Sequence, residues 1–167
     1  LLATLAAPPL IELGIVPLSA HMFVLYFGMM SMITPPVAIA AFVAANMAGA
    51  HPMRTGFEAV RIGWPAYVVP FLFVLSPHLL LAGSWTDNIY AAVAATAGVY
   101  LGTIAVVGFY RHTLALPMRL AFALAGLSLL MPESLFPGAA IMNMGGIAGG
   151  LMLLAFARFG VKQDRSV

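Results

Sequence analysis

A serine, a threonine and two consecutive prolines lie together at residues 31–36, with the sequence SMITPP, inside an otherwise apolar stretch. Because proline has no backbone N–H, Pro35 and Pro36 cannot donate to the carbonyls four residues earlier in a helix, those of Ser31 and Met32. In an apolar environment such carbonyls need protein, water or an ion as a partner. Carbonyl and hydroxyl oxygens at a broken helix are typical sodium ligands, so this stretch is a candidate ion site.

The same residues predict how a break would be built. The half-helix over residues 18–30 would end there with its negative dipole end, and Thr34 is expected to be the N-cap of a second half-helix that begins at Pro35. The positive end of that second half could face an anionic substrate. The alternative is a simple kink, in which Ser31 bonds back to a carbonyl of its own helix. On the chemistry of these residues alone, both interpretations stay open.

Composition identifies the environment of the chain. Of its 167 residues, 63% are hydrophobic and only 7% are charged, and the mean hydropathy is +1.05, which is typical of an integral membrane protein. Seven scattered lysines and arginines are too few for a nucleic-acid surface. The absence of cysteine excludes disulfides, thiolate nucleophiles and cysteine metal sites. The chain begins with Leu1 and has no basic segment before its first apolar run, so we expect a fragment without a signal peptide.

Apolar runs that approach the roughly 20 residues needed to cross a bilayer occur at residues 63–82, 89–110, 118–131 and 138–157, the third being short. A longer, interrupted run over residues 18–48 and a truncated one over residues 1–11 precede them. Alanine-rich runs and the lack of strict alternation favour helices over a membrane barrel. The expected fold is therefore an all-α helical bundle in the lipid bilayer, with one proline-broken transmembrane helix.

Basic residues predict the orientation of the spans. Lysine and arginine occur within residues 49–62, 111–119 and 158–165, whereas the connections at residues 83–88 and 132–137 have none. By the positive-inside rule the first group is cytoplasmic, as is the C-terminus. Residues 12–21 also lack lysine and arginine, so we expect residues 18–48 to cross once as a broken helix. Five aromatic residues are expected to form a belt at the interfaces: Trp64, Tyr67, Trp85, Tyr90 and Tyr110.

The motif YFGMMSMITPPVAIAAF, followed by GAHPMRTGFEA, carries a resemblance to a known family. It resembles the last discontinuous helix and the next segment of the large membrane subunit of TRAP transporters (tripartite ATP-independent periplasmic transporters), of the fused-permease type. The resemblance covers residues 1–82 and implies part of an inverted-repeat ion-transporter fold. Its elements would be a hairpin arm (1–11), a broken helix (18–48), an interfacial helix (52–62) and a span (63–82). Residues 83–167 resemble three additional C-terminal transmembrane helices.

This resemblance implies a function and a site. Members take up carboxylate-type organic acids, delivered by a periplasmic substrate-binding protein, across the bacterial inner membrane, with sodium as the coupling ion and no other cofactor. The remainder of the permease chain, including its small-subunit region, would be a partner. We expect no enzyme activity, and the competing hypothesis is a non-transporting scaffold or assembly subunit with a mere kink. The implied sodium ligands are Gly28, Ser31, Met32 and Thr34, mostly through carbonyls, and Pro35 and Pro36 hold the break open.

Other features are expected to be mainly structural. Two overlapping GxxxG patterns, at Gly145/Gly149 and Gly146/Gly150, predict close helix packing. Asn46 is expected either to form an interhelical hydrogen bond or to line the transport path. The segment 52–62 is expected to be an amphipathic interfacial helix with a weak ion pair between Glu58 and Arg61, or a stiff connector that couples the broken helix to the next span.

Overall fold

The computed structural model describes residues 2–132 and 138–159, and in this part of the chain nearly all regular structure is helical. The chain forms two compact units, Leu1–Asn88 and Ile89–Val167, which are described separately below. Three described stretches are long and apolar enough to cross a membrane: Pro52–Leu75, Trp85–Val107 and Ala139–Arg158. Two shorter apolar helices, Pro17–Met30 and Leu116–Leu130, accompany them. The expected class, a helical integral membrane bundle, is confirmed.

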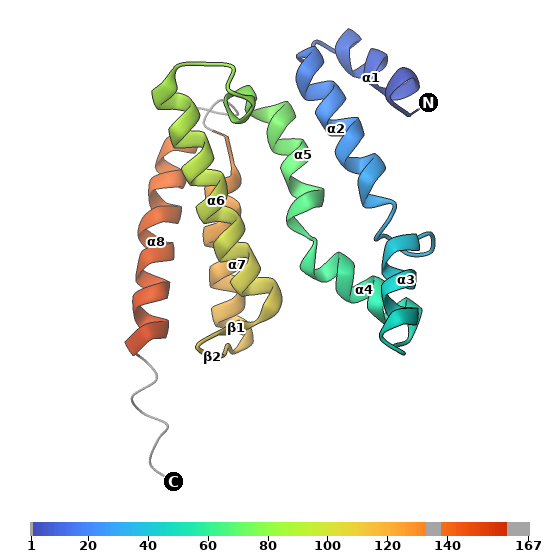
Figure 1. Cartoon of the computed structure of the whole chain (residues 1–167). Coiled ribbons are helices and arrows are strands. Elements are labelled where there is room, and N and C mark those ends of the chain that lie inside the picture. The colour runs from blue at the N-terminus through green and yellow to red at the C-terminus, as the bar shows by residue number, and fades with distance from the viewer. Residues whose placement is uncertain (1, 133–137, 160–167) are drawn as a thin grey trace. The chain divides into compact units, whose positions relative to one another are not determined.

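The first unit consists of helices that turn back beside one another (Figure 1). After α2 the chain passes through an irregular segment at residues 31–38 into α3, and then returns through α4 and α5, so that α5 packs on α2 and α4 on α3. Several of these helices begin with proline, which needs no N–H at a first-turn position. Their bounds are α1 Leu2–Glu12, α2 Pro17–Met30, α3 Ile39–Met47, α4 Pro52–Ile62, α5 Pro65–Leu75 and η1 Pro77–Leu80.

Aromatic side chains hold α2 and α5 together. Phe71 of α5 meets Phe23 and Phe27 of α2 edge-on, with ring centroids 5.2 and 5.6 Å apart. Tyr26 and Phe73 form a third edge contact at 5.5 Å. Because edge-to-face pairs add about 0.5–1.5 kcal/mol to the burial of their rings, these contacts fix α5 beside the half-helix that precedes the break.

The sequence predicts a single span over residues 63–82. In the structure this run does not form one helix. Helix α5 ends at Leu75, and Ser76 leaves the helical region with φ −137° and ψ 87° because the next residue is Pro77. The expected loop at residues 83–88 is also shorter, since α6 (Trp85–Val107) begins inside it. The Ser84 hydroxyl accepts from the Asp87 backbone N–H at 3.2 Å and therefore caps the start of α6. It also donates to the Asp87 carboxylate at 2.6 Å.

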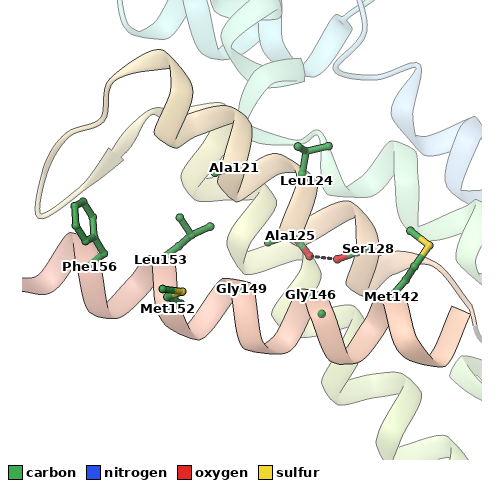
Figure 2. A pocket seen from close by; sticks show the side chains of 11 residues that line it. Ala121, Leu124, Ala125, Ser128, Met142, Gly146, Gly149, Met152, Leu153 and Phe156 are labelled. Carbon is green, nitrogen blue, oxygen red and sulfur yellow. Dashed lines mark hydrogen bonds between the residues drawn. The ribbon is translucent and has the colours of Figure 1, made fainter. Parts of the chain in front are cut away.

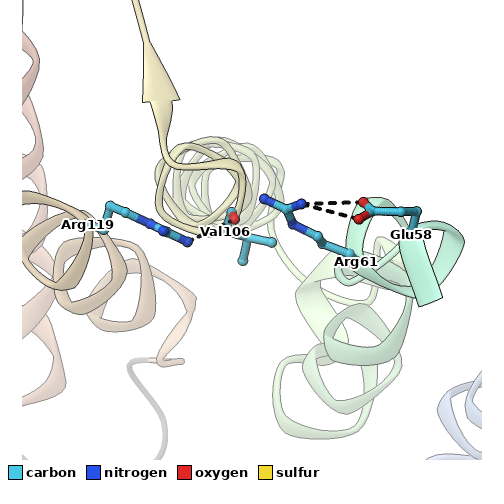
Figure 3. Close-up of polar contacts among 4 residues, drawn as sticks. All are labelled: Glu58, Arg61, Val106 and Arg119. Atoms are coloured by element: carbon cyan, nitrogen blue, oxygen red, sulfur yellow. Dashed lines mark hydrogen bonds and ion pairs between the residues drawn. The ribbon is translucent and has the colours of Figure 1, made fainter. Parts of the chain in front are cut away.

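The second unit contains the rest of α6, a short antiparallel ribbon of β1 (Phe109–Tyr110) and β2 (His112–Thr113), α7 (Leu116–Leu130) and α8 (Ala139–Phe159). Arg119 closes the end of α6 by donating to the carbonyls of Ala105 at 2.9 Å and Val106 at 3.2 Å, the second of which Figure 3 shows. These carbonyls lack helical donors, and a cation near a helix C-terminus also complements the dipole.

Figure 3 also shows the ion pair within α4. Arg61 and Glu58 lie 3.4 Å apart and both are well exposed, so the predicted pair is confirmed. An exposed pair of this spacing contributes only a few tenths of a kcal/mol. The expected bounds of this helix, residues 52–62, are also those of α4.

Glycines allow the helices of the second unit to approach closely. A Cβ on Gly126 would lie 2.9 Å from the Gly102 nitrogen and the Gly98 oxygen, so α6 and α7 touch backbone to backbone. Gly146 of α8 lies directly against the side chain of Ser128 of α7, as its GxxxG pattern predicted. Gly145 and Gly149 have open space instead and line an apolar groove of about 590 Å³ between α7 and α8, shown in Figure 2. The predicted packing is therefore present for the Gly146/Gly150 row and absent, among the described residues, for the Gly145/Gly149 row.

Candidate functional site

The predicted break is present between α2 and α3, at residues 31–38. The expected start of the second half-helix at Pro35 is wrong, because α3 begins at Ile39 after Ala38, which has the left-handed conformation with φ 33°. Each proline disfavours the helical conformation of the residue before it, which favours an interruption at Thr34 and Pro35. The two prolines are joined by a cis peptide bond and lie in a turn.

Thr34 lies after α2, bonds back to its last residue and is not the N-cap of α3. Its backbone N–H donates to the Met30 carbonyl at 3.0 Å, and its hydroxyl donates to the same carbonyl. The Thr34 hydroxyl oxygen also lies 2.7 Å from the Tyr67 hydroxyl of α5. The side chain that was expected to start the second half-helix thus closes the first one and ties it to the neighbouring span.

The carbonyls at the break are only partly free. The Met32 carbonyl accepts from the Ala40 N–H at 3.0 Å, so the expectation that the prolines leave it without a donor is wrong. The turn folds the start of α3 back, and Ala40 supplies the donor that Pro36 lacks. The Ser31 carbonyl makes no hydrogen bond to the part of the chain that the structure describes. The Ser31 hydroxyl donates to the Gly28 carbonyl at 2.7 Å, which is the back-bond of the kink interpretation.

These oxygens nevertheless keep lone pairs that no hydrogen bond of the described residues uses. A carbonyl oxygen has two lone pairs, and the hydrogen bonds at the break use one each on Gly28, Met32 and Thr34. Ser31 and Met32 are exposed, while Gly28 and Thr34 are half-buried. The four predicted ligand residues lie in one short stretch and offer only neutral oxygens, which suit a hard cation. Within residues 2–132 and 138–159 no group of three or more histidine, aspartate or glutamate side chains could hold a metal ion.

The electrostatic field at the break comes from the dipoles of the two helices that end there. The last turn of α2 contains no basic residue, so no side chain of that turn neutralises the negative end of its dipole. The first turn of α3 contains no acidic residue, so its positive end is likewise uncompensated there. The break therefore places a cation-attracting and an anion-attracting helix end within a few residues of each other.

The segment after the break contributes contacts that the sequence interpretation did not anticipate. A Cβ on Gly56 of α4 would lie 2.8 Å from Cγ of Pro35, and one on Gly63 would lie 3.1 Å from Cδ1 of Ile33. Tyr67, which was assigned to an aromatic belt, bonds to Thr34. The seven-residue spacing of Gly56 and Gly63, which places small residues on one helix face, was the available signal.

Asn46 lies on the exposed side of α3 and makes no side-chain hydrogen bond to the described residues. Ala41 and Ala45 of the same helix are buried instead. The expected interhelical hydrogen bond of Asn46 is thus not formed within this part of the chain. Its role in a transport path stays a prediction.

Comparison with known proteins gave one family match. Residues 1–89 match the family described as "Tripartite ATP-independent periplasmic transporter, DctM component". The match contains the whole first unit, with the break and the segment that packs on it, and ends where the second unit begins. No significant match was found among curated proteins or solved structures.

Proposed function

Because the chain belongs to the DctM-component family of tripartite ATP-independent periplasmic transporters, and hence to a membrane permease, we propose that its break is part of a sodium site that drives transport. The observation that carries this proposal is the group of neutral oxygens at the end of α2. Gly28, Ser31, Met32 and Thr34 present carbonyls with unused lone pairs, together with the Thr34 hydroxyl, beside an uncompensated helix end. Transporters bind sodium at such half-helix ends.

We further propose that the substrate is a carboxylate-type organic acid that a periplasmic substrate-binding protein delivers. The positive end of α3 lies directly after the turn, and its first turn carries no acidic side chain to compete with an anion. The remaining donors would come from other parts of the permease. Asn46, exposed on the same short helix, would then lie along the path of the substrate.

For the orientation in the inner membrane, we propose that the C-terminus and α4 are cytoplasmic, since the basic residues gather there. Ala82 is exposed in the connection between η1 and α6, and the chain has no native cysteine. An Ala82→Cys variant should react with a membrane-impermeant maleimide from the periplasmic side of intact cells. Labelling only in inside-out vesicles would contradict this orientation.

Uptake of a carboxylate substrate by the complete permease and its binding protein, reconstituted in liposomes, tests the sodium proposal. Thr34→Val keeps the shape of the side chain but removes the hydroxyl, and should raise the sodium concentration for half-maximal uptake about tenfold, the scale of losing a polar contact to a charge. The matched control is Thr96→Val. The Thr96 hydroxyl bonds back at 2.7 Å to the Ala92 carbonyl in the uninterrupted α6 and should leave sodium dependence unchanged.

The alternative hypothesis, that the break is only a kink, predicts that sodium dependence does not change. If Thr34→Val and Thr96→Val lower only the amount of folded protein and leave sodium half-saturation equal to that of the natural chain, the break is not a sodium site. Uptake that ignores the sodium gradient altogether would overturn sodium coupling itself. Inability of the complete permease to move any carboxylate would favour the scaffold alternative.

A further inference from the structure

The hydroxyl of Tyr67 has a role that an aromatic belt does not explain. Tyr67 lies in the first turns of α5 and is half-buried, and its oxygen lies 2.7 Å from Oγ1 of Thr34, 33 residues earlier. A belt tyrosine would direct its hydroxyl to lipid headgroups and water. Here the hydroxyl points to the side chain of a proposed sodium ligand.

The direction of the hydrogen bonds follows from counting protons. Thr34 has one hydroxyl proton, and it is donated to the Met30 carbonyl. With that proton directed to Met30, whose carbonyl also accepts from the backbone N–H groups of Ile33 and Thr34, we assign the proton between the two hydroxyls to Tyr67. The resulting chain runs from Tyr67 O–H to Thr34 O–H to Met30 C=O. The Thr34 oxygen uses one of its two lone pairs to accept from Tyr67, and the second stays available.

This arrangement orients Thr34 for a cation. With its proton directed to Met30, the hydroxyl cannot rotate that proton toward a bound ion, where it would repel the charge. Both hydrogen bonds fix the rotamer before the ion arrives, so less conformational freedom is lost on binding. Hydrogen bonds in a chain also polarise one another.

The rest of the segment fixes the same geometry. Gly56 lies against Pro35 and Gly63 against Ile33, so α4 and the start of α5 follow the turn at successive points. In these positions a larger residue would displace the turn from Tyr67. The hydroxyl pair thus acts together with these two glycine contacts.

We propose that Tyr67 is a positioning residue that sets the sodium affinity of the break by orienting the Thr34 hydroxyl. This inference rests on the proposed sodium site. Tyr67 does not bind the ion itself. It acts through Thr34, so its removal should change sodium affinity and leave the maximal rate at saturating sodium nearly unchanged.

The test is Tyr67→Phe in the complete permease, with uptake measured over a range of sodium concentrations. Loss of one neutral hydrogen bond should raise the half-saturating sodium concentration about 2- to 10-fold. Sodium chloride, but not choline chloride, should raise the melting temperature of the detergent-solubilised permease. In the variant the sodium concentration needed for this rise should increase by the same 2- to 10-fold factor. Tyr26→Phe is the matched control, since Tyr26 also lies in the first unit and makes a ring contact with Phe73.

A double-mutant cycle separates positioning from general structure. In a Thr34→Val background, Tyr67→Phe should have no further effect on sodium half-saturation, because the oriented hydroxyl is gone. Additive effects, or a Tyr67→Phe variant that behaves as Tyr26→Phe does, would overturn the inference while the sodium site stands. Absence of any sodium response in the natural permease would overturn both.

Discussion

The chain contains two Pro-Pro pairs with opposite outcomes. Pro8 and Pro9 lie inside α1, which runs without interruption over Leu2–Glu12. Pro35 and Pro36 lie where the helix has stopped at Met30 and restarts only at Ile39. The same dipeptide is therefore compatible with a continuous helix and with a break, and the difference must come from its surroundings.

The two proline pairs differ in their packing and in the hydrogen-bond partners near them. Pro8 and Pro9 are exposed, and the buried residue beside them is Ala7, so they lie on the outer side of α1. Pro35 instead packs on Gly56, and the turn around it obtains hydrogen bonds from Ala40 and Tyr67. An interrupted helix is stable in an apolar environment only where its polar groups find such partners.

The largest expected effect comes from replacing the pairs with alanine. Pro35→Ala with Pro36→Ala restores two backbone donors and removes about 3 kcal/mol or more of helix penalty per proline, so the break should close toward a continuous helix. Sodium-driven uptake should then fall by tenfold or more, although the protein remains abundant. Pro8→Ala with Pro9→Ala should change uptake little. Equal losses in both variants would show that the two pairs do not differ in function.

A smaller effect is expected at Gly56. Gly56→Leu places a side chain where the Pro35 ring now lies, and overpacking of this kind costs about 1–3 kcal/mol. The apparent melting temperature of the solubilised permease should drop, together with its sodium affinity. Gly145→Leu, in a helical position with nothing within 4 Å, is the control and should change neither quantity. If both variants melt like the natural protein, α4 does not support the break.

Local rules predicted much of the fold. Apolar runs indicated the helices α6, α7 and α8, and the prolines indicated the interruption between α2 and α3. Charge spacing indicated the ion pair of Glu58 with Arg61. The same rules misplaced the start of α3 and the end of α5, because they treated Pro35 as a helix starter and overlooked the effect of Pro77 on Ser76.

At the candidate site, the sequence determined which groups are present, and the tertiary structure determined how they are hydrogen-bonded. The sequence by itself determined a membrane environment, a break near Pro35 and Pro36, and a supply of neutral oxygens, because these depend on residue type and on neighbours within about one helical turn. Only the tertiary structure decided which oxygens are already bonded and where the Thr34 proton points. The donors involved, Ala40 and Tyr67, reach the break only after the chain has turned back on itself.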